Sequence, residues 1–362
     1  MWQRIGRYAG YTLLWLLALV VVLWARGGSK EYRTAQHVTA IDIDVKGHGE
    51  GLVDATLIEE WILQHNLSPI GSSLDKVDLA ALEQLVESHN AVSEANAYVT
   101  HSGKLSLIVK QHKPIARLRV NHYDMYVTAE GYIFPAANSH AAFVPVITGD
   151  YQPLFEADYR GLQRSVVQDS IAVLEQEILT LEREKLQLHK NRRASRDTMR
   201  MVVADRVSKS PFRSEEEQAI LVSAYEMRKA DASRRYAAYS SYIDREMQMR
   251  TQQQDSRRMS QQKLRNAEAD FEAMVAFVKH ISEDAFWRSE VVQIVATGGG
   301  ERALQLSVVP RSGRFLVDMG FTDALPAKLA TLRRFYDRAL SNLGWDKYRS
   351  ISLRYNGQVV CR

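Results

Sequence analysis

The sequence contains a single cysteine, Cys361, the penultimate of its 362 residues. An internal disulfide and a cysteine-rich zinc or iron–sulfur site are therefore excluded. An excess of one charge is also nearly absent, because 47 Lys and Arg face 43 Asp and Glu. A dedicated nucleic-acid binder usually has a stronger and more clustered basic excess. With 46% hydrophobic residues, the chain can fill the cores of two or three folded domains.

Catalytic and metal-binding signatures are equally scarce. The histidines are scattered with no repeated ligand spacing, so we expect surface or packing residues rather than metal ligands. No Ser-His-Asp or Cys-His set can be assembled from local motifs. Residues 298–300 are three glycines, but no Lys-Ser/Thr follows them, which favours a hairpin turn over a phosphate loop. The residues themselves point to no class of enzyme.

The sequence has only one long apolar run. Residues 8–25 carry no charge, and Ile5 to Ala25 is long enough to cross a bilayer as a helix. We predict a single uncleaved membrane anchor. A cleaved signal peptide is the alternative, but Ala25 would pair with Leu23 at the cleavage site, where small residues are usual. Basic residues flank both sides of the run, so charge alone does not decide its orientation.

A small mixed module is predicted after the anchor. Residues 39–46 alternate apolar and polar side chains, which is typical of a half-buried strand. Asp54 and Asp78 are each placed to cap an amphipathic helix. Two further strands are predicted at residues 92–100 and 104–110. The order strand, helix, helix, strand, strand resembles that of a POTRA domain.

Several weak motifs in a fixed order extend this resemblance. They are Val109-Lys-Gln-His-Lys-Pro-Ile-Ala116, Gly131-Tyr-Ile-Phe-Pro135 followed by Val144-Pro-Val-Ile-Thr-Gly149, Phe315-Leu-Val-Asp-Met-Gly320, and the closing segment Ser350 to Arg362. Together they resemble the FtsQ/DivIB cell-division family, and the closing segment is similar to the form found in Bacteroidetes. The resemblance covers roughly residues 1–150 and 270–362.

Between these two regions lies a highly charged segment. Residues 161–270 hold 21 basic and 17 acidic residues but only one Gly and one Pro, which is typical of long helices. Apolar residues from Val167 to Leu188 recur at a spacing of three or four, which predicts a coiled-coil-like arm. Pro211 marks the apex, and Ser214 with Glu217 forms a capping box for a return arm. A disordered charged linker is the alternative.

The expected fold class is α+β. It combines a single N-terminal transmembrane helix, a POTRA-like domain of β-α-α-β-β order, and a mixed β domain interrupted by an extended helical hairpin. The expected boundaries are a cytoplasmic tail at 1–7, the span at 8–25, a linker at 26–37, the POTRA-like domain at 38–113, the β domain at 114–160 and 271–362, and the hairpin at 161–270.

The family resemblance implies a function without catalysis. It implies a divisome scaffold in the inner membrane, with its bulk in the periplasm, no cofactor or metal, and no nucleic acid. The implied partners are FtsB/FtsL-like bitopic proteins and other division proteins. One alternative is a transport adaptor of the membrane-fusion type, although the lipoyl-like half-motifs expected beside its hairpin are not found. A tethered peptidoglycan-cleaving enzyme is another alternative, and it would need a catalytic carboxylate that the sequence does not indicate.

The last strand is the predicted partner site. Its alternation places Ile351, Leu353 and Tyr355 on one face, which we expect to pack against Phe335 and Tyr336. The opposite face carries Ser350, Ser352 and Arg354. We expect the backbone edge of this strand to receive a partner strand, where the family receives FtsB. In the alternative, Val359 and Val360 fold back through an Asn356-Gly357 turn and cover that edge.

Overall fold

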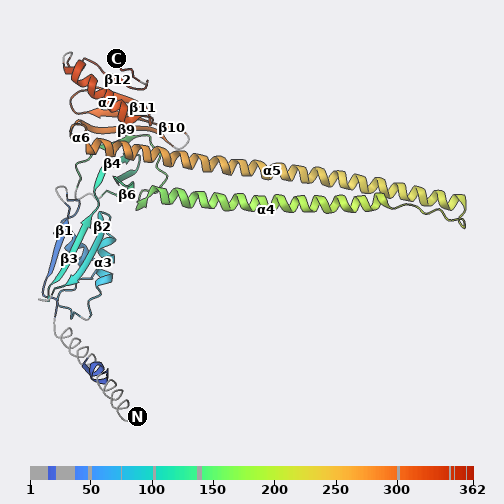
Figure 1. The fold of residues 1–362 in the computed structure, drawn as a ribbon, viewed down its shortest axis with the longest axis horizontal. Coiled ribbons are helices and arrows are strands. Elements are labelled where there is room, and N and C mark those ends of the chain that lie inside the picture. Colours follow the sequence, from blue (N-terminus) through green and yellow to red (C-terminus); the bar gives the residue numbers. More distant parts are fainter. Residues whose placement is uncertain are drawn as a thin grey trace, which may run out of the picture.

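The protein is described by a computed structural model in which two sheets and a long helical arm are the main features (Figure 1). The structure describes residues 15–21, 37–47, 51–74, 76–100, 103–136, 141–299, 302–341, 344–345, 347–355 and 357–362.

The first sheet has three strands and two helices. In chain order they are β1 (Ile41–Lys46), α2 (Ala55–Gln64), α3 (Leu79–Glu87), β2 (Val92–Val99) and β3 (Leu105–Gln111). Strand β3 lies in the middle, parallel to β1 and antiparallel to β2. The predicted order of elements is confirmed.

Both helices begin at the predicted caps. The Asp54 carboxylate accepts a hydrogen bond from the Leu57 N–H (2.8 Å), and the Asp78 carboxylate accepts one from the Ala81 N–H (3.0 Å). These bonds satisfy backbone donors that the first turn of a helix leaves unpaired. The buried face of each helix then covers the sheet through aliphatic side chains, namely Ile58, Ile62, Leu82 and Val86.

The second sheet has ten strands. They are β4 (Pro114–Val120), β5 (Tyr123–Thr128), β6 (Tyr132–Pro135), β7 (Val146–Gly149), β8 (Gly161–Leu162), β9 (Val291–Gly299), β10 (Arg302–Pro310), β11 (Leu316–Phe321), β12 (Ser350–Ser352) and β13 (Val360–Cys361). Their order in the sheet is β13-β12-β11-β10-β9-β7-β4-β5-β6-β8. Strands from both sides of the charged segment therefore form one sheet.

Strand β7 joins the two halves of this sheet. It lies between β4 and β9 and runs parallel to both. Its last residue, Gly149, has φ +115° and pairs with Ala296 of β9. A Cβ atom at Gly149 would lie 2.1 Å from the Ala296 carbonyl oxygen, which no side chain tolerates. The final glycine of the Val144–Gly149 motif is therefore explained by the close approach of two strands.

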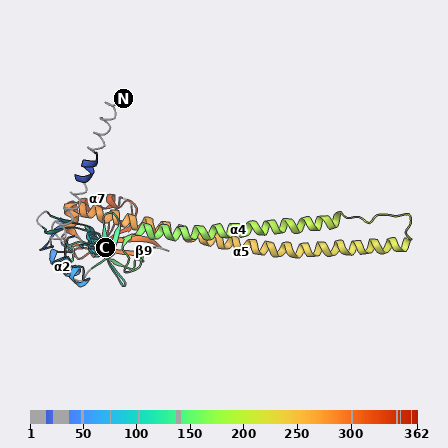
Figure 2. The same ribbon diagram turned by 90° about the horizontal axis from the view of Figure 1, so that it is seen from below.

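The charged segment forms two long antiparallel helices. They are α4 (Gln163–Ala204) and α5 (Glu215–Glu283), which project far beyond the sheets (Figures 1 and 2). At 1.5 Å per residue the helices are about 63 and 104 Å long. The predicted apex and the Ser214–Glu217 capping box are both present. The alternative of a disordered linker is not what the structure shows.

Helix α5 belongs to the arm and to the core of the large sheet at once. It passes without a break through residue 270, where we expected the hairpin to end. From Phe271 to Ile281 its inner face is buried among the strands and α7 (Leu325–Phe335). The arm is thus an extension of a core helix and not a segment joined by a flexible connection.

The two sheets share apolar contacts. Tyr126 of β5 and Phe134 of β6 are buried within the core of the small sheet. The ring of His112, in the two-residue connection between β3 and β4, stacks on Tyr132 at 4.3 Å between ring centroids. Burial lowers the pKa of His112, and the nearby Arg160 charge lowers it further.

Arg160 links the large sheet to helix α3. Its guanidinium donates hydrogen bonds to the carbonyl oxygens of Glu87 (2.9 Å) and Ser88, at the end of α3. The last carbonyls of a helix have no partner within the helix and carry partial negative charge, so a cation is stabilising there. Burial, followed by the charge of Arg160, also lowers the pKa of His89.

The predicted membrane span falls mostly outside the described residues. Residues 15–21 are helical and exposed. Within the described part of the chain, no helix has both the length and the apolar character needed to cross a bilayer.

We predict that the contacts of α5 in the core of the large sheet contribute more to the free energy of unfolding than the contacts between α4 and α5 in the arm. Phe271 is almost fully buried in the core, whereas Leu174 of α4 is only half-buried in the arm. Phe271→Ala should lower the free energy of unfolding by about 3 kcal/mol or more, and Leu174→Ala by about 1 kcal/mol. Urea denaturation followed by circular dichroism would measure both. Equal effects would contradict the shared-helix arrangement.

Candidate partner-binding surface

The C-terminal end of the large sheet is the region where we expected a partner. Strand β11 is followed by α7, a π-helical turn η1 (Tyr336–Leu340), and strands β12 and β13. Strand β12 pairs in parallel with β11 and antiparallel with β13. Strand β13 is therefore the outermost strand at this end of the sheet.

The expectation that Ser350 to Tyr355 forms the open edge is wrong. The chain reverses after Tyr355, with Gly357 at φ +73°, and returns beside β12. Ser350 and Arg362 exchange two backbone hydrogen bonds of 3.2 and 2.9 Å. The alternative expected from the sequence, a terminal hairpin, is the one formed. Its physical reason is that a short return strand satisfies backbone groups that β12 would otherwise leave unpaired.

The unpaired edge lies one strand further out. In an antiparallel pair, successive residues direct their N–H and C=O groups to alternate sides. Ser350 bonds to Arg362, and Val360 stands opposite Ser352, so both Val360 and Arg362 direct their backbone groups toward β12. The N–H and C=O of Cys361 therefore face away from the sheet.

The apolar face of β12 packs largely as predicted. Ile351, Leu353 and Tyr336 are buried in the core of the large sheet, and Phe335 is half-buried against it. Tyr355 differs, because its side chain is 64% exposed. Tyr355 lies three residues beyond the end of β12, where the chain begins to reverse, so the alternation of side chains along the strand no longer determines its direction.

Tyr336 sits in a cluster of aromatic rings. Burial raises the pKa of its phenol, and the nearby Glu290 carboxylate raises it further. The rings that surround it at 5.1 to 6.2 Å between centroids are those of Phe286, Trp287, Phe315 and Trp345. This cluster belongs to the same buried core as the apolar side chains of β12. Tyr336 is therefore a core residue and is not exposed on the surface.

The opposite face of the sheet is polar and ordered by Asp318. Its carboxylate accepts hydrogen bonds from the Gly320 N–H (2.9 Å) and the Ser352 hydroxyl (3.3 Å), and forms an ion pair with Arg354 (3.2 Å). Arg354 also donates to the Gln305 side chain at 2.8 Å. One carboxylate thus holds the backbone of β11 together with the side chain at the end of β12 and that of Arg354, two residues further on.

Gly320 makes room for this arrangement. It has φ +70°, and a Cβ atom there would lie 2.8 Å from Cγ of Arg354. The glycine that ends the Phe315–Gly320 motif therefore combines a left-handed backbone conformation with close contact to a charged side chain.

A shallow hollow of about 470 Å³ lies over this polar face. Its lining includes Gln305, Asp318, Ser352, Arg354, Tyr355 and Val360. Hydroxyl, amide, carboxylate and guanidinium groups meet there with one exposed aromatic ring. Such a surface can bind a protein segment by hydrogen bonds and stacking.

Among the residues that the structure describes, no group of three or more His, Cys, Asp or Glu side chains is placed to hold a metal ion. The thiol of Cys361 is half-buried beside the core, and burial raises its pKa. It is thus less reactive than an exposed thiol.

Sequence reasoning placed the open edge at Ser350 to Tyr355, one strand too far in, and missed Asp318, Gln305 and the outward edge of Cys361. Asp318 lay inside a motif already singled out for its glycine. Gln305 gave no signal, since it reaches Arg354 only through the pairing of β10, β11 and β12.

We predict that Asp318 stabilises this end of the sheet. Asp318→Ala removes one acceptor shared by three donors and should lower the free energy of unfolding by about 1–2 kcal/mol. Asp337→Ala, on the exposed side of η1, should change it by less than about 0.5 kcal/mol. Chemical denaturation of both variants is the measurement. An unchanged Asp318→Ala variant would refute the role of this carboxylate.

Comparison with known families agrees with this architecture. A family model described as "FtsQ/DivIB, C-terminal related" matches residues 234–362, which span most of α5 and strands β9 to β13. A model described as a POTRA-like domain matches residues 36–110. No curated protein matches the chain. The two matched regions stand in the order that the sequence motifs predicted, and together they support an FtsQ/DivIB family protein.

Proposed function

We propose that this protein is a non-catalytic scaffold of the division machinery that binds bitopic FtsB/FtsL-like proteins at the C-terminal end of its large sheet. The family match supports a cell-division role. The observation that carries the binding site is the outward edge of β13, where a two-residue strand ends the sheet.

Strand addition is the proposed mode of binding. An extended partner segment would pair with the N–H and C=O of Cys361, while its side chains meet the exposed Tyr355 and Val360. Arg354 and the hollow beside it offer polar contacts to the flanking residues of the partner. Four of the predicted residues would act indirectly, because their side chains pack in the core and hold β12 in place: Ile351, Leu353, Phe335 and Tyr336.

The compartment is part of the same proposal. The apolar run at residues 8–25 would anchor the chain in the inner membrane, and both sheets and the arm would lie in the periplasm. The POTRA-like domain would then lie nearest the membrane. It would be free to meet other division proteins while the C-terminal sheet binds its own.

We predict that the partner depends on one backbone N–H. Cys361→Pro removes the outward donor of β13 without removing a bond between β12 and β13. Recovery of the FtsB-like partner by copurification from crosslinked cells should fall at least tenfold. Cys361→Ala is the matched control, because it keeps the N–H and should retain the partner. Full recovery with a folded Cys361→Pro variant would contradict strand addition.

The topology has its own test. Alkaline phosphatase fused after Arg362 should be active, since this enzyme needs an oxidising compartment to form its disulfides. A reporter that works only in the cytosol should be silent at the same position. The reverse pair of results would contradict the periplasmic location.

A further inference from the structure

The arm has an unequal distribution of charge along α4. Residues 168–184 hold five Asp or Glu and one Arg, whereas residues 185–200 hold six Lys or Arg and one Asp. The half of α4 near the sheets is therefore acidic and the far half is basic.

Helix α5 neutralises much of the acidic half but little of the basic half. Ion pairs across the arm join Glu177 to Arg257, Glu182 to Arg258, Glu184 to Arg250, and Arg192 to Asp244. Further along α4, within the described residues, no acidic side chain of α5 pairs with Arg193, Arg196 or Arg200. Lys190 also has no such partner. Arg196 lies 3.9 Å from Asp197 of its own helix. The basic half therefore keeps a net positive charge on its surface.

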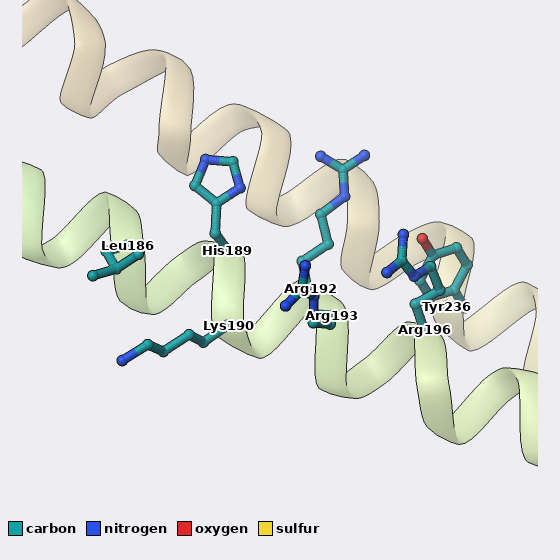
Figure 3. Close-up of a pocket in the computed structure, with 7 residues that line it drawn as sticks. All are labelled: Leu186, His189, Lys190, Arg192, Arg193, Arg196 and Tyr236. Atoms are coloured by element: carbon teal, nitrogen blue, oxygen red, sulfur yellow. The ribbon is translucent and has the colours of Figure 1, made fainter.

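Acidic and basic side chains of both halves share one flank of α4. At seven-residue spacing this flank carries Leu179, Leu186 and Arg193, and beside them Glu175, Glu182, His189 and Arg196. Leu186 stands at the boundary between the acidic and basic halves and is 56% exposed. A hollow beside this flank is lined by Leu186, His189, Lys190, Arg192, Arg193 and Arg196 of α4 and by Tyr236 of α5 (Figure 3). Figure 3 shows Lys190 extending away from α5.

This flank is complementary to itself when reversed. In an antiparallel pair of α4 helices centred on Leu186, Glu182 stands opposite the turn of His189 and Lys190. Glu175, eleven residues from the centre, stands opposite Arg196, ten residues from it on the other side. At 1.5 Å per residue these positions agree to within about 2 Å along the axis. Leu186 meets the Leu186 of the second copy.

We propose that this flank of α4 is a self-association surface, on which a second copy of the chain binds antiparallel about Leu186. A twofold contact uses the same patch on both chains, so it requires the self-complementarity that this flank has. Each acidic side chain would meet a basic one twice, once on each side of the axis. The result is a four-helix arrangement of two arms, with the sheets of the two copies at opposite ends.

Charge complementarity favours a second copy over an anionic membrane surface. A polyanion or lipid headgroup layer would use only the basic half of the flank and would be repelled by Glu175. The exposed Leu179 and Leu186 lie in the acidic half and at its boundary, where a headgroup layer would leave them uncovered. A second copy covers both leucines and pairs both signs of charge.

A cysteine at the centre of the flank tests the geometry. The background is the full chain in detergent with Cys361→Ser, so that no other thiol is present. Packed helices lie about 8–10 Å apart with Cα atoms about 2.3 Å from each axis, so facing Cα atoms would be about 3.4–5.4 Å apart, which overlaps the range of about 4.4–6.8 Å found in disulfides. Leu186→Cys should form a covalent dimer on mild oxidation.

A register control uses Leu179. Two copies of Leu179→Cys would be about 21 Å apart along the axis and should not crosslink to each other. A mixture of Leu179→Cys chains with Arg193→Cys chains should crosslink, because these positions face one another. If Leu186→Cys forms no covalent dimer under conditions where light scattering detects a noncovalent dimer, the antiparallel arrangement is wrong.

Charge exchange tests complementarity without thiols. Glu182→Lys and Lys190→Glu should each weaken the dimer about tenfold, since each creates two like-charge contacts. The double variant should restore it. Lys209→Glu, at the exposed apex, is the matched control and should change nothing. A chain that is monomeric at all concentrations would overturn the proposal. Binding of that monomeric chain to sedimenting phosphatidylglycerol vesicles would identify a membrane surface as the occupant instead.

Discussion

The inner face of α5, buried between Ala267 and Ile281, is the contact on which both the large sheet and the arm depend. Strands β4 to β8 precede α5 in the chain and β9 to β13 follow it, and the apolar face of this helix packs against both groups. Without that buried face the two halves of the sheet would be joined mainly by the pairing of β7 with β9 and by the contacts of Asp150 with Gly298 and Arg302. The same helix then continues outward as one side of the arm, so the position of the arm is fixed by core packing.

The C-terminal surface depends on contacts at both faces of β12. One face of β12 is apolar and rests on Tyr336 and its neighbouring rings, and the other is polar and is ordered by Asp318. Because the strand is held from both faces, its pairing with β13 can be short. A two-residue terminal strand leaves only a small edge, which limits nonspecific pairing and suits the single partner strand that we propose for it.

Local patterns in the sequence predicted most elements but not their boundaries. The caps at Asp54 and Asp78, the Ser214–Glu217 capping box and the glycine motifs are local signals, and each appears where expected. The covering of β12 by β13 depends on a competition between two pairings that residue alternation cannot rank. The end of the hairpin was expected at residue 270 because the composition changes there from polar to apolar. The sequence has no helix-breaking residue at that point, and α5 continues from the arm into the core.

A rigid helix that is fixed at one end acts as a lever. About 22 Å of α5 is held in the core between Ala267 and Ile281, while about 78 Å projects beyond it. Any sideways force on the tip of the arm would therefore reach the buried segment multiplied about threefold or more, and β9 follows α5 after only the short α6 (Ala285–Glu290). Tension or torque on the arm would bear directly on the strands that lead to the C-terminal edge, which gives this long extension a mechanical route to the opposite end of the sheet.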